Sequence, residues 1–158
     1  LAENHHIPPH LSGWQYLQRC AELLNINRSD ATDQCRRIVK QIGIEGRENT
    51  KTNTYSKGMI QRLGMGAALL GNPKLLLLDE PTAGLDPIGI IEIRQLLESL
   101  KNQGMTIFLN SHLLSEVEKI CDNAAIIHQG RLLVKDNIAA LIKNGDTLED
   151  VFVRLVKG

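Results

Sequence analysis

Two adjacent carboxylates follow a short aliphatic run in the middle of the chain. Residues 75–78 are four consecutive leucines, and Asp79 and Glu80 come directly after them. Such a run predicts a strand covered on both faces of a parallel sheet, and ligands bind at the carboxyl ends of such strands. Successive strand side chains point in opposite directions, so one acid can hold a hydrated Mg²⁺ while the other polarises an attacking water. The alternative is a strand that leaves the core into a polar loop, with Glu80 solvated.

A second candidate feature is the predicted start of a helix at Ser56. Unpaired backbone N–H groups and the helix dipole make a helix start an anion site. The alternative is a plain Ser N-cap. A capping box would need Glu or Gln at position 59, which is Met59.

Two further features lie downstream of the acids. Asp86 precedes Pro87, which suits the first position of a helix, although an ordinary Asp cap explains the same pair. His112 follows a second predicted strand, 105–109, and is expected on the same sheet edge as Asp79. A lone histidine there is more often a surface residue than a catalytic one.

The composition excludes several functional classes. Lys+Arg and Asp+Glu are both 18 of 158 residues, so the net charge is zero, which argues against nucleic-acid binding. Aromatic residues make up only 3%, too few for a base-stacking platform. The hydrophobic fraction of 42% is enough for a core, and no apolar run approaches the length of a membrane helix. Three widely spaced cysteines indicate a reduced cytosolic protein with buried thiols.

The periodicity predicts a helical part followed by alternating strands and helices. The predicted helices are 12–25, with Leu24 on its inner face, then 31–42, 56–70, 87–102, with Ile91 packing inward, 111–121 and 137–143. The predicted strands are 75–79, 105–109, and a hairpin of 124–128 and 131–134. Residues 27–30 are predicted as a turn. Alternation of this kind indicates an α/β layer with a mostly parallel sheet.

These segments, in this order and spacing, resemble the nucleotide-binding domain of ATP-binding cassette (ABC) proteins. The matching segments are 55–59 for the signature motif, 75–80 for the Walker B strand, 84–87 for the D-loop and His112 for the switch histidine. Residues 1–4 are similar to the Q-loop, with Glu3 where Gln is commoner. Residues 148–152 are similar to the tail of cassettes that serve ABC-2-type exporters.

The resemblance implies an α/β fold with a P-loop NTPase-like parallel sheet and an all-helical subdomain, the amino-terminal part of the fold being missing. Residues 1–72 would hold the Q-loop remnant, the helical subdomain and the signature helix. Residues 73–158 would hold the Walker B strand, D-loop and switch histidine with a carboxyl-terminal hairpin and tail. The helical lobe would carry a groove for a membrane-spanning partner.

The resemblance also implies a mechanism that uses ATP and Mg²⁺. Two such domains dimerise head to tail around Mg-ATP. Asp79 would hold Mg²⁺ through water, Glu80 would be the general base, and His112 would bond the γ-phosphate. Ser56 and the N–H of Gly58 would contact the γ-phosphate bound by the partner domain.

Three more residues are candidates for nucleotide contacts. Asp86 would signal across the dimer, and Glu3 would act at the Q-loop position. Lys57 either adds positive charge near the γ-phosphate or points to solvent. The implied subunit is an ATPase that works with a separate membrane permease at the inner face of the cell membrane.

One motif of the family is missing from the sequence. A phosphate loop reads G-x-x-x-x-G-K-[ST], and this sequence contains no Gly-Lys dipeptide. We therefore expect the carboxyl-terminal part of a longer cassette, unable to hydrolyse ATP alone. Two alternatives stay open: a soluble ABC ATPase acting on ribosomes or DNA, and a non-catalytic interaction module.

His5, His6 and His10 are expected in a mobile polar lead-in.

Overall fold

The structure, a computed structural model, describes residues 1–3 and 5–157. Asn4, which is part of the predicted Q-loop segment, lies outside the described residues. The chain forms two compact units, Leu1–Asn110 and Ser111–Gly158. The predicted domain boundary between residues 72 and 73 falls within the first unit and stays a prediction.

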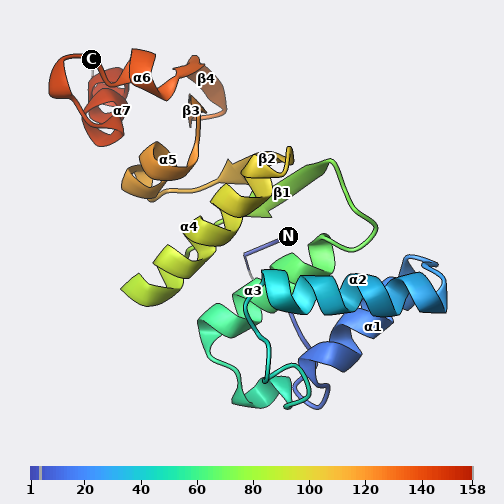
Figure 1. Cartoon of the computed structure of the whole chain (residues 1–158). Coiled ribbons are helices and arrows are strands. Elements are labelled where there is room, and N and C mark those ends of the chain that lie inside the picture. The colour runs from blue at the N-terminus through green and yellow to red at the C-terminus, as the bar shows by residue number, and fades with distance from the viewer. Residues whose placement is uncertain (4, 158) are drawn as a thin grey trace. The chain divides into compact units, whose positions relative to one another are not determined.

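The first unit combines helices with one parallel pair of strands (Figure 1). Its elements are α1 (Gly13–Leu23), α2 (Arg28–Gln41), the 3-10 helix η1 (Thr52–Thr54), α3 (Lys57–Ala68), β1 (Leu75–Asp79), α4 (Pro87–Asn102) and β2 (Thr106–Asn110). Helices α1, α2 and α3 pack against one another, and α3 also contacts α4. Asp79 lies opposite Asn110 in the parallel register, and α4 forms the crossover between the two strands.

Side-chain caps explain where the helices begin. Ser12 and Gln15 form a reciprocal capping box at the start of α1, and Asp86 caps α4 ahead of Pro87. These predicted starts are confirmed. Helix α2 begins at Arg28 because Asn27 Oδ1 accepts a hydrogen bond from the N–H of Asp30 at 3.0 Å. The prediction of a turn at 27–30 was therefore wrong.

The prediction that the leucine strand is covered on both faces was also wrong. Leu76 and Leu78 are buried, whereas Leu75 and Leu77 are about half exposed. On β2, Phe108 is exposed as well. The described elements therefore cover only one face of the sheet, and a run of identical leucines carries no alternation from which this could be predicted.

Two other predicted core positions lie at the surface. Leu24 comes after the last residue of α1 and is exposed. Ile91 is exposed, and Ile93 is the fully buried residue of that turn of α4. Leu17 of α1 and Leu96, Leu97 and Leu100 of α4 are buried, so both helices face the core as the periodicity predicts, and the error lies at Leu24 and Ile91.

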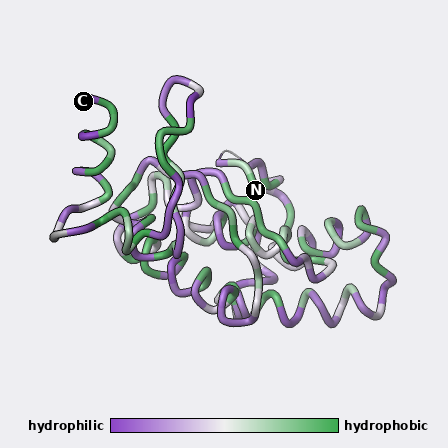
Figure 2. The backbone as a smooth tube through the Cα atoms, turned by 90° about the horizontal axis from the view of Figure 1, so that it is seen from above, coloured by the Kyte–Doolittle hydropathy of each residue, from purple (hydrophilic) through white to green (hydrophobic). Residues whose placement is uncertain are grey.

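The second unit consists of a hairpin and short helices. Its elements are α5 (Leu114–Ile120), β3 (Asn123–His128), β4 (Arg131–Asn137), α6 (Ile138–Leu141), the 3-10 helix η2 (Lys143–Gly145) and α7 (Leu148–Lys157). Gln129 and Gly130 both have positive φ, as a tight hairpin turn requires. Helix α7 buries Leu148 and Val151, and Figure 2 shows its alternating hydrophobic and hydrophilic residues along the coil that leads to the C-terminus.

Across the described residues, no helix combines the length and apolar character needed to cross a membrane.

Candidate functional site

The carboxyl end of β1 presents the first predicted site residue, Asp79. Its Oδ1 accepts a hydrogen bond of 2.9 Å from Nδ2 of Asn110, the residue opposite it at the end of β2. Asp79 is exposed, so this bond orients the carboxylate without removing it from solvent. A carboxylate that is oriented and solvent-exposed in this way is suited to bind a hydrated cation.

Glu80 follows β1 in an unusual backbone conformation. Its φ is +47°, in the left-handed region that a non-glycine residue adopts at a cost. The Glu80 N–H donates to the carbonyl of Asn110 at 2.9 Å, and its own carbonyl accepts from the N–H of Ala83 at 3.2 Å. The chain therefore turns sharply directly after Asp79. Strained backbone of this kind clusters at functional sites.

The start of α3 carries Ser56, Lys57 and Gly58. Ser56 is the N-cap, and its Oγ accepts from the N–H of Met59 at 3.2 Å. The N–H groups of Lys57 and Gly58, at the first two helical positions, have no acceptor within the helix. Both interpretations of this segment thus remain compatible, since a capped start still presents N–H groups to an anion.

Tyr55 is the residue before the N-cap of α3, and contacts with neighbouring segments hold its side chain in place. Its hydroxyl donates to the carbonyl of Arg47 at 2.7 Å. A Cβ added at Gly13 would lie 2.6 Å from the same hydroxyl. Burial raises the pKa of Tyr55, so the phenol stays protonated and keeps donating. The amino-terminal end of α3 is therefore held by α1 and the loop that precedes η1.

Lys57 lies over the loop that precedes α4. A Cβ added at Gly84 would lie 2.1 Å from Lys57 Nζ, and Gly84 has a φ of +65°. Asp86, two residues later, accepts from the N–H of Gly89 at 2.7 Å. The Cβ position of Gly58 would lie 3.8 Å from the Cα of Gly89. The starts of α3 and α4 therefore adjoin, which brings the predicted signature and D-loop residues together.

Glu3 and His112 complete the predicted set. Glu3 is exposed, two residues after Leu1, whose backbone bonds to β1. His112 belongs to the second unit, two residues after the end of β2. Their roles stay predictions.

Sequence reasoning missed a contact between the lead-in and α3. His5 is half-buried against α3, with Nε2 3.2 Å from the carbonyl oxygen of Ile60. The expected mobile lead-in is wrong for this residue, because its ring occupies the space beside Gly64. A glycine in the interior of a predicted helix was the available signal.

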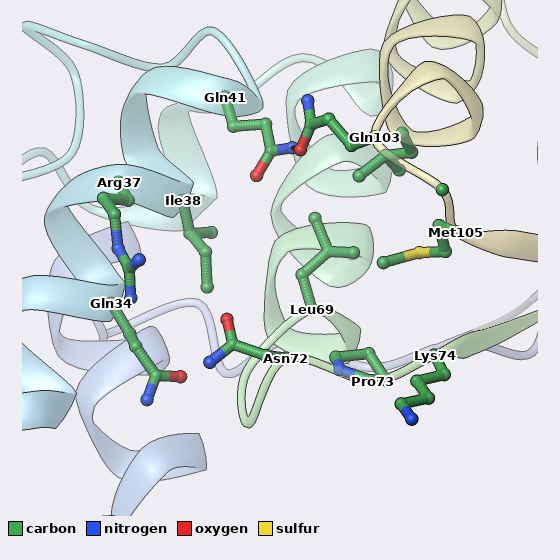
Figure 3. Close-up of a pocket in the computed structure, with 12 residues that line it drawn as sticks. Gln34, Arg37, Ile38, Gln41, Leu69, Asn72, Pro73, Lys74, Gln103 and Met105 are labelled. Atoms are coloured by element: carbon green, nitrogen blue, oxygen red, sulfur yellow. Dashed lines mark hydrogen bonds between the residues drawn. The ribbon is translucent and has the colours of Figure 1, made fainter.

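Other groups contribute little to a site. A cavity of about 380 Å³ lies beside Arg37, Ile38, Leu69, Lys74 and Met105 (Figure 3), at the amino ends of the strands. The acids stand at the carboxyl ends, so this cavity is not their ligand pocket. Burial raises the pKa of Cys35 to about 11, which leaves an unreactive thiol. Within the described ranges, no three His, Cys, Asp or Glu side chains gather as a metal site.

Comparison with known proteins identifies the class to which this fold and site belong. The ABC transporter family matches residues 1–83. The chain therefore belongs to the ABC transporter family, as an ATP-binding domain. This confirms the predicted family and its α/β fold class.

Similar proteins include ATP-binding proteins of the same family. The chain is 42% identical over 149 residues to the uncharacterized ABC transporter ATP-binding protein all4389 of Nostoc sp.. The aligned region covers 93% of this chain and 44% of that relative. The chain is 47% identical over 114 residues to the bacitracin transport ATP-binding protein BcrA of Bacillus licheniformis, covering 72% of this chain and 36% of the relative. The chain thus spans less than half the length of these two relatives.

Solved structures agree with the sequence relatives. An ATP-binding subunit of an ABC transporter superimposes with a TM-score of 0.80 at 26% identity, covering 98% of this chain and 66% of that one. The cbiO1 protein from Clostridium perfringens, part of the ABC transporter complex cbiONQ, gives a TM-score of 0.78 at 31% identity, covering 94% and 59%.

Proposed function

We propose that this chain is part of the ATP-hydrolysing subunit of an ABC exporter, which couples ATP hydrolysis to export through a separate membrane subunit. The observation that carries the proposal is the end of β1, where Asp79 is held by Asn110 at 2.9 Å and Glu80 follows in a left-handed turn. Relatedness to a bacitracin transport protein supports export.

The two acids take different roles in this proposal. Bound Mg²⁺ would neutralise phosphate charge, and Asp79 fits it because carboxylate oxygens are its preferred ligands. Asn110 holds Oδ1 of Asp79, and the carboxylate would hold the ion through water. Glu80 is the general base, which takes the proton of the attacking water.

The helix starts supply the contacts to a second nucleotide-binding domain. The capped start of α3 offers the Ser56 hydroxyl and the Gly58 N–H to the γ-phosphate held by that domain. Lys57 adds a positive charge there from its place over Gly84. Asp86, at the adjoining start of α4, signals across the dimer.

Two contacts come from outside these helix starts. His112 bonds the γ-phosphate from the segment that follows β2. Glu3, on the lead-in segment, contacts the bound Mg-ATP. Both assignments rest on the family resemblance of their positions.

The loop that binds the phosphates most strongly in such enzymes is missing from this sequence. No G-x-x-x-x-G-K-[ST] segment occurs in these 158 residues, and its amides and lysine supply most of the hold on ATP in such enzymes. We therefore propose that the 158 residues alone do not hydrolyse ATP. The working subunit operates as a head-to-tail dimer on the inner face of the membrane, bound to its permease.

The test is Glu80→Gln in the full gene product. The amide cannot accept the proton, so we expect hydrolysis to fall about a hundredfold or more, while ATP binding is retained and the dimer accumulates. Glu98→Gln, an exposed acid on α4, is the matched control and should hydrolyse ATP normally. Unimpaired turnover of Glu80→Gln would remove Glu80 as the base.

A second measurement separates the membrane assignment from its alternatives. The native gene product is purified from its own cells and its associated components are identified. Co-purification with a membrane protein is expected. Association with ribosomes or DNA instead would favour a soluble ABC ATPase.

A further inference from the structure

The segment that carries Glu3 is attached to the first unit at two places. The first is β1: the nitrogen of Leu1 donates to the carbonyl of Leu77 at 2.6 Å, and the N–H of Asp79 donates to the carbonyl of Leu1 at 3.0 Å. Leu1 is thus paired with the strand that ends in the predicted magnesium ligand.

The second attachment is His5 on α3. Its Nε2 lies 3.2 Å from the carbonyl oxygen of Ile60, and its Nδ1 lies 3.3 Å from the carbonyl oxygen of Ala2. The ring therefore joins the lead-in to the helix that begins at Ser56. The Ile60 carbonyl also accepts the helical N–H of Gly64, because one carbonyl oxygen can accept two donors.

Gly64 makes this attachment possible. A Cβ at position 64 would lie 2.3 Å from Nε2 of His5, 2.7 Å from Cδ2 and 2.9 Å from Cε1. No side chain larger than hydrogen fits beneath the ring. Glycine inside a helix is less favourable than alanine, and the fit of the imidazole against position 64 is a physical reason for a glycine there.

We propose that His5 is a positioning residue, which fastens the Glu3 segment to α3 so that the carboxylate of Glu3 is placed between the strand of Asp79 and the helix of Ser56. Glu3 stands two residues from each attachment. The effect on activity rests on the proposed function, whereas the attachment itself does not.

The attachment is tested by a double-mutant cycle in the full gene product, in which urea unfolding measures the stability of each variant. Gly64→Ala alone should destabilise the protein, since the new Cβ displaces the ring. In the His5→Ala background the same change should instead favour folding about fivefold, as helix propensity then decides. Gly66→Ala, whose Cβ would meet Ile38 and Ile42, is the matched control and should destabilise both backgrounds equally.

The positioning role is tested by ATPase kinetics of the same protein. His5→Ala should lower kcat about tenfold, as expected when a contacting group is misplaced, and leave KM within about twofold. His5→Gln keeps a donor near the Nε2 position and should recover most of the rate. His6→Ala, an exposed neighbour, should behave as wild type.

The outcomes are separable. Equal effects of Gly64→Ala in both backgrounds would overturn the attachment. Coupling between positions 5 and 64 with an unchanged kcat in His5→Ala would overturn the positioning role. A wild-type protein without ATPase activity would remove the proposed function and with it the positioning role for catalysis, while the unfolding cycle would still decide the attachment.

Discussion

At the scale of single residues, Asn110 connects the two acids of the candidate site. Its side chain donates to Asp79 at 2.9 Å, and its carbonyl accepts from the N–H of Glu80 at 2.9 Å. The end of β2 therefore orients the predicted metal ligand and shapes the turn of the predicted base. The side-chain bond can be removed by mutation while the backbone bond remains.

Asn110→Ala should weaken the response of the ATPase to Mg²⁺. Without the amide, the Asp79 carboxylate is exposed and free to rotate, so a Mg²⁺ concentration about tenfold higher is needed for half-maximal turnover. Stability should change little, because Asp79 remains solvated. The measurement is a Mg²⁺ titration of ATPase in the full gene product, with Asn53→Ala, an exposed residue of η1, as control. An unchanged Mg²⁺ requirement would mean that Asn110 does not orient the ligand.

The sequence was informative about residues whose chemistry is local. The Ser56 and Asp86 caps could be predicted, because a cap needs only a side-chain oxygen and a nearby N–H. The contact of His5 could not, because Ile60 is 55 positions away and the interior glycine at position 64 does not indicate which residue packs against it. Long-range contacts of this kind depend on the packing of elements, which one sequence does not reveal.

At the scale of elements, the loop between β1 and α4 depends on the geometry of Gly84. Its φ of +65° and the Nζ of Lys57 beside it both favour glycine. The two causes differ in strength. A lysine end is flexible and can move away, whereas a left-handed backbone penalises any side chain.

Gly84→Ala should therefore destabilise the full gene product by about 1 kcal/mol, and adding Lys57→Ala should recover little of this loss. Urea unfolding measures both. Gly46→Ala isolates the backbone cost, because Gly46 has a φ of +78° and nothing within 4 Å of its Cβ position. A loss at Gly84 far above that at Gly46, and restored by Lys57→Ala, would show that the contact dominates instead.

Element boundaries were predictable where the sequence carries strong start and stop signals for helices and strands. The helix 87–102 and the strand 75–79 have the predicted bounds, since Asp86-Pro87 starts one and Asp79 ends the other. The start of α2 was missed because Asn27 reads equally as a turn residue and as a cap. The helix predicted at 111 begins only at Leu114.

At the scale of the whole molecule, the two faces of the sheet formed by β1 and β2 differ in exposure: one is buried and the other is open to solvent. Leu76 and Leu78 are 2% and 3% exposed, whereas Leu75 and Leu77 are 50% and 55% exposed. Phe108 adds to the exposed side. Exposed apolar surface of this kind favours association.

The two faces should respond oppositely to a polar substitution in the 158-residue chain. Leu78→Gln should cost about 3 kcal/mol or more, because it leaves a cavity and an unpaired buried amide. Leu77→Gln, one position earlier and of the same chemistry, should change stability by no more than about 0.5 kcal/mol and should reduce self-association, because it breaks the apolar patch. Urea unfolding and light scattering measure the two effects. An equal loss of stability at both positions would mean that the exposed face is packed against another surface in solution, such as a second copy of the chain.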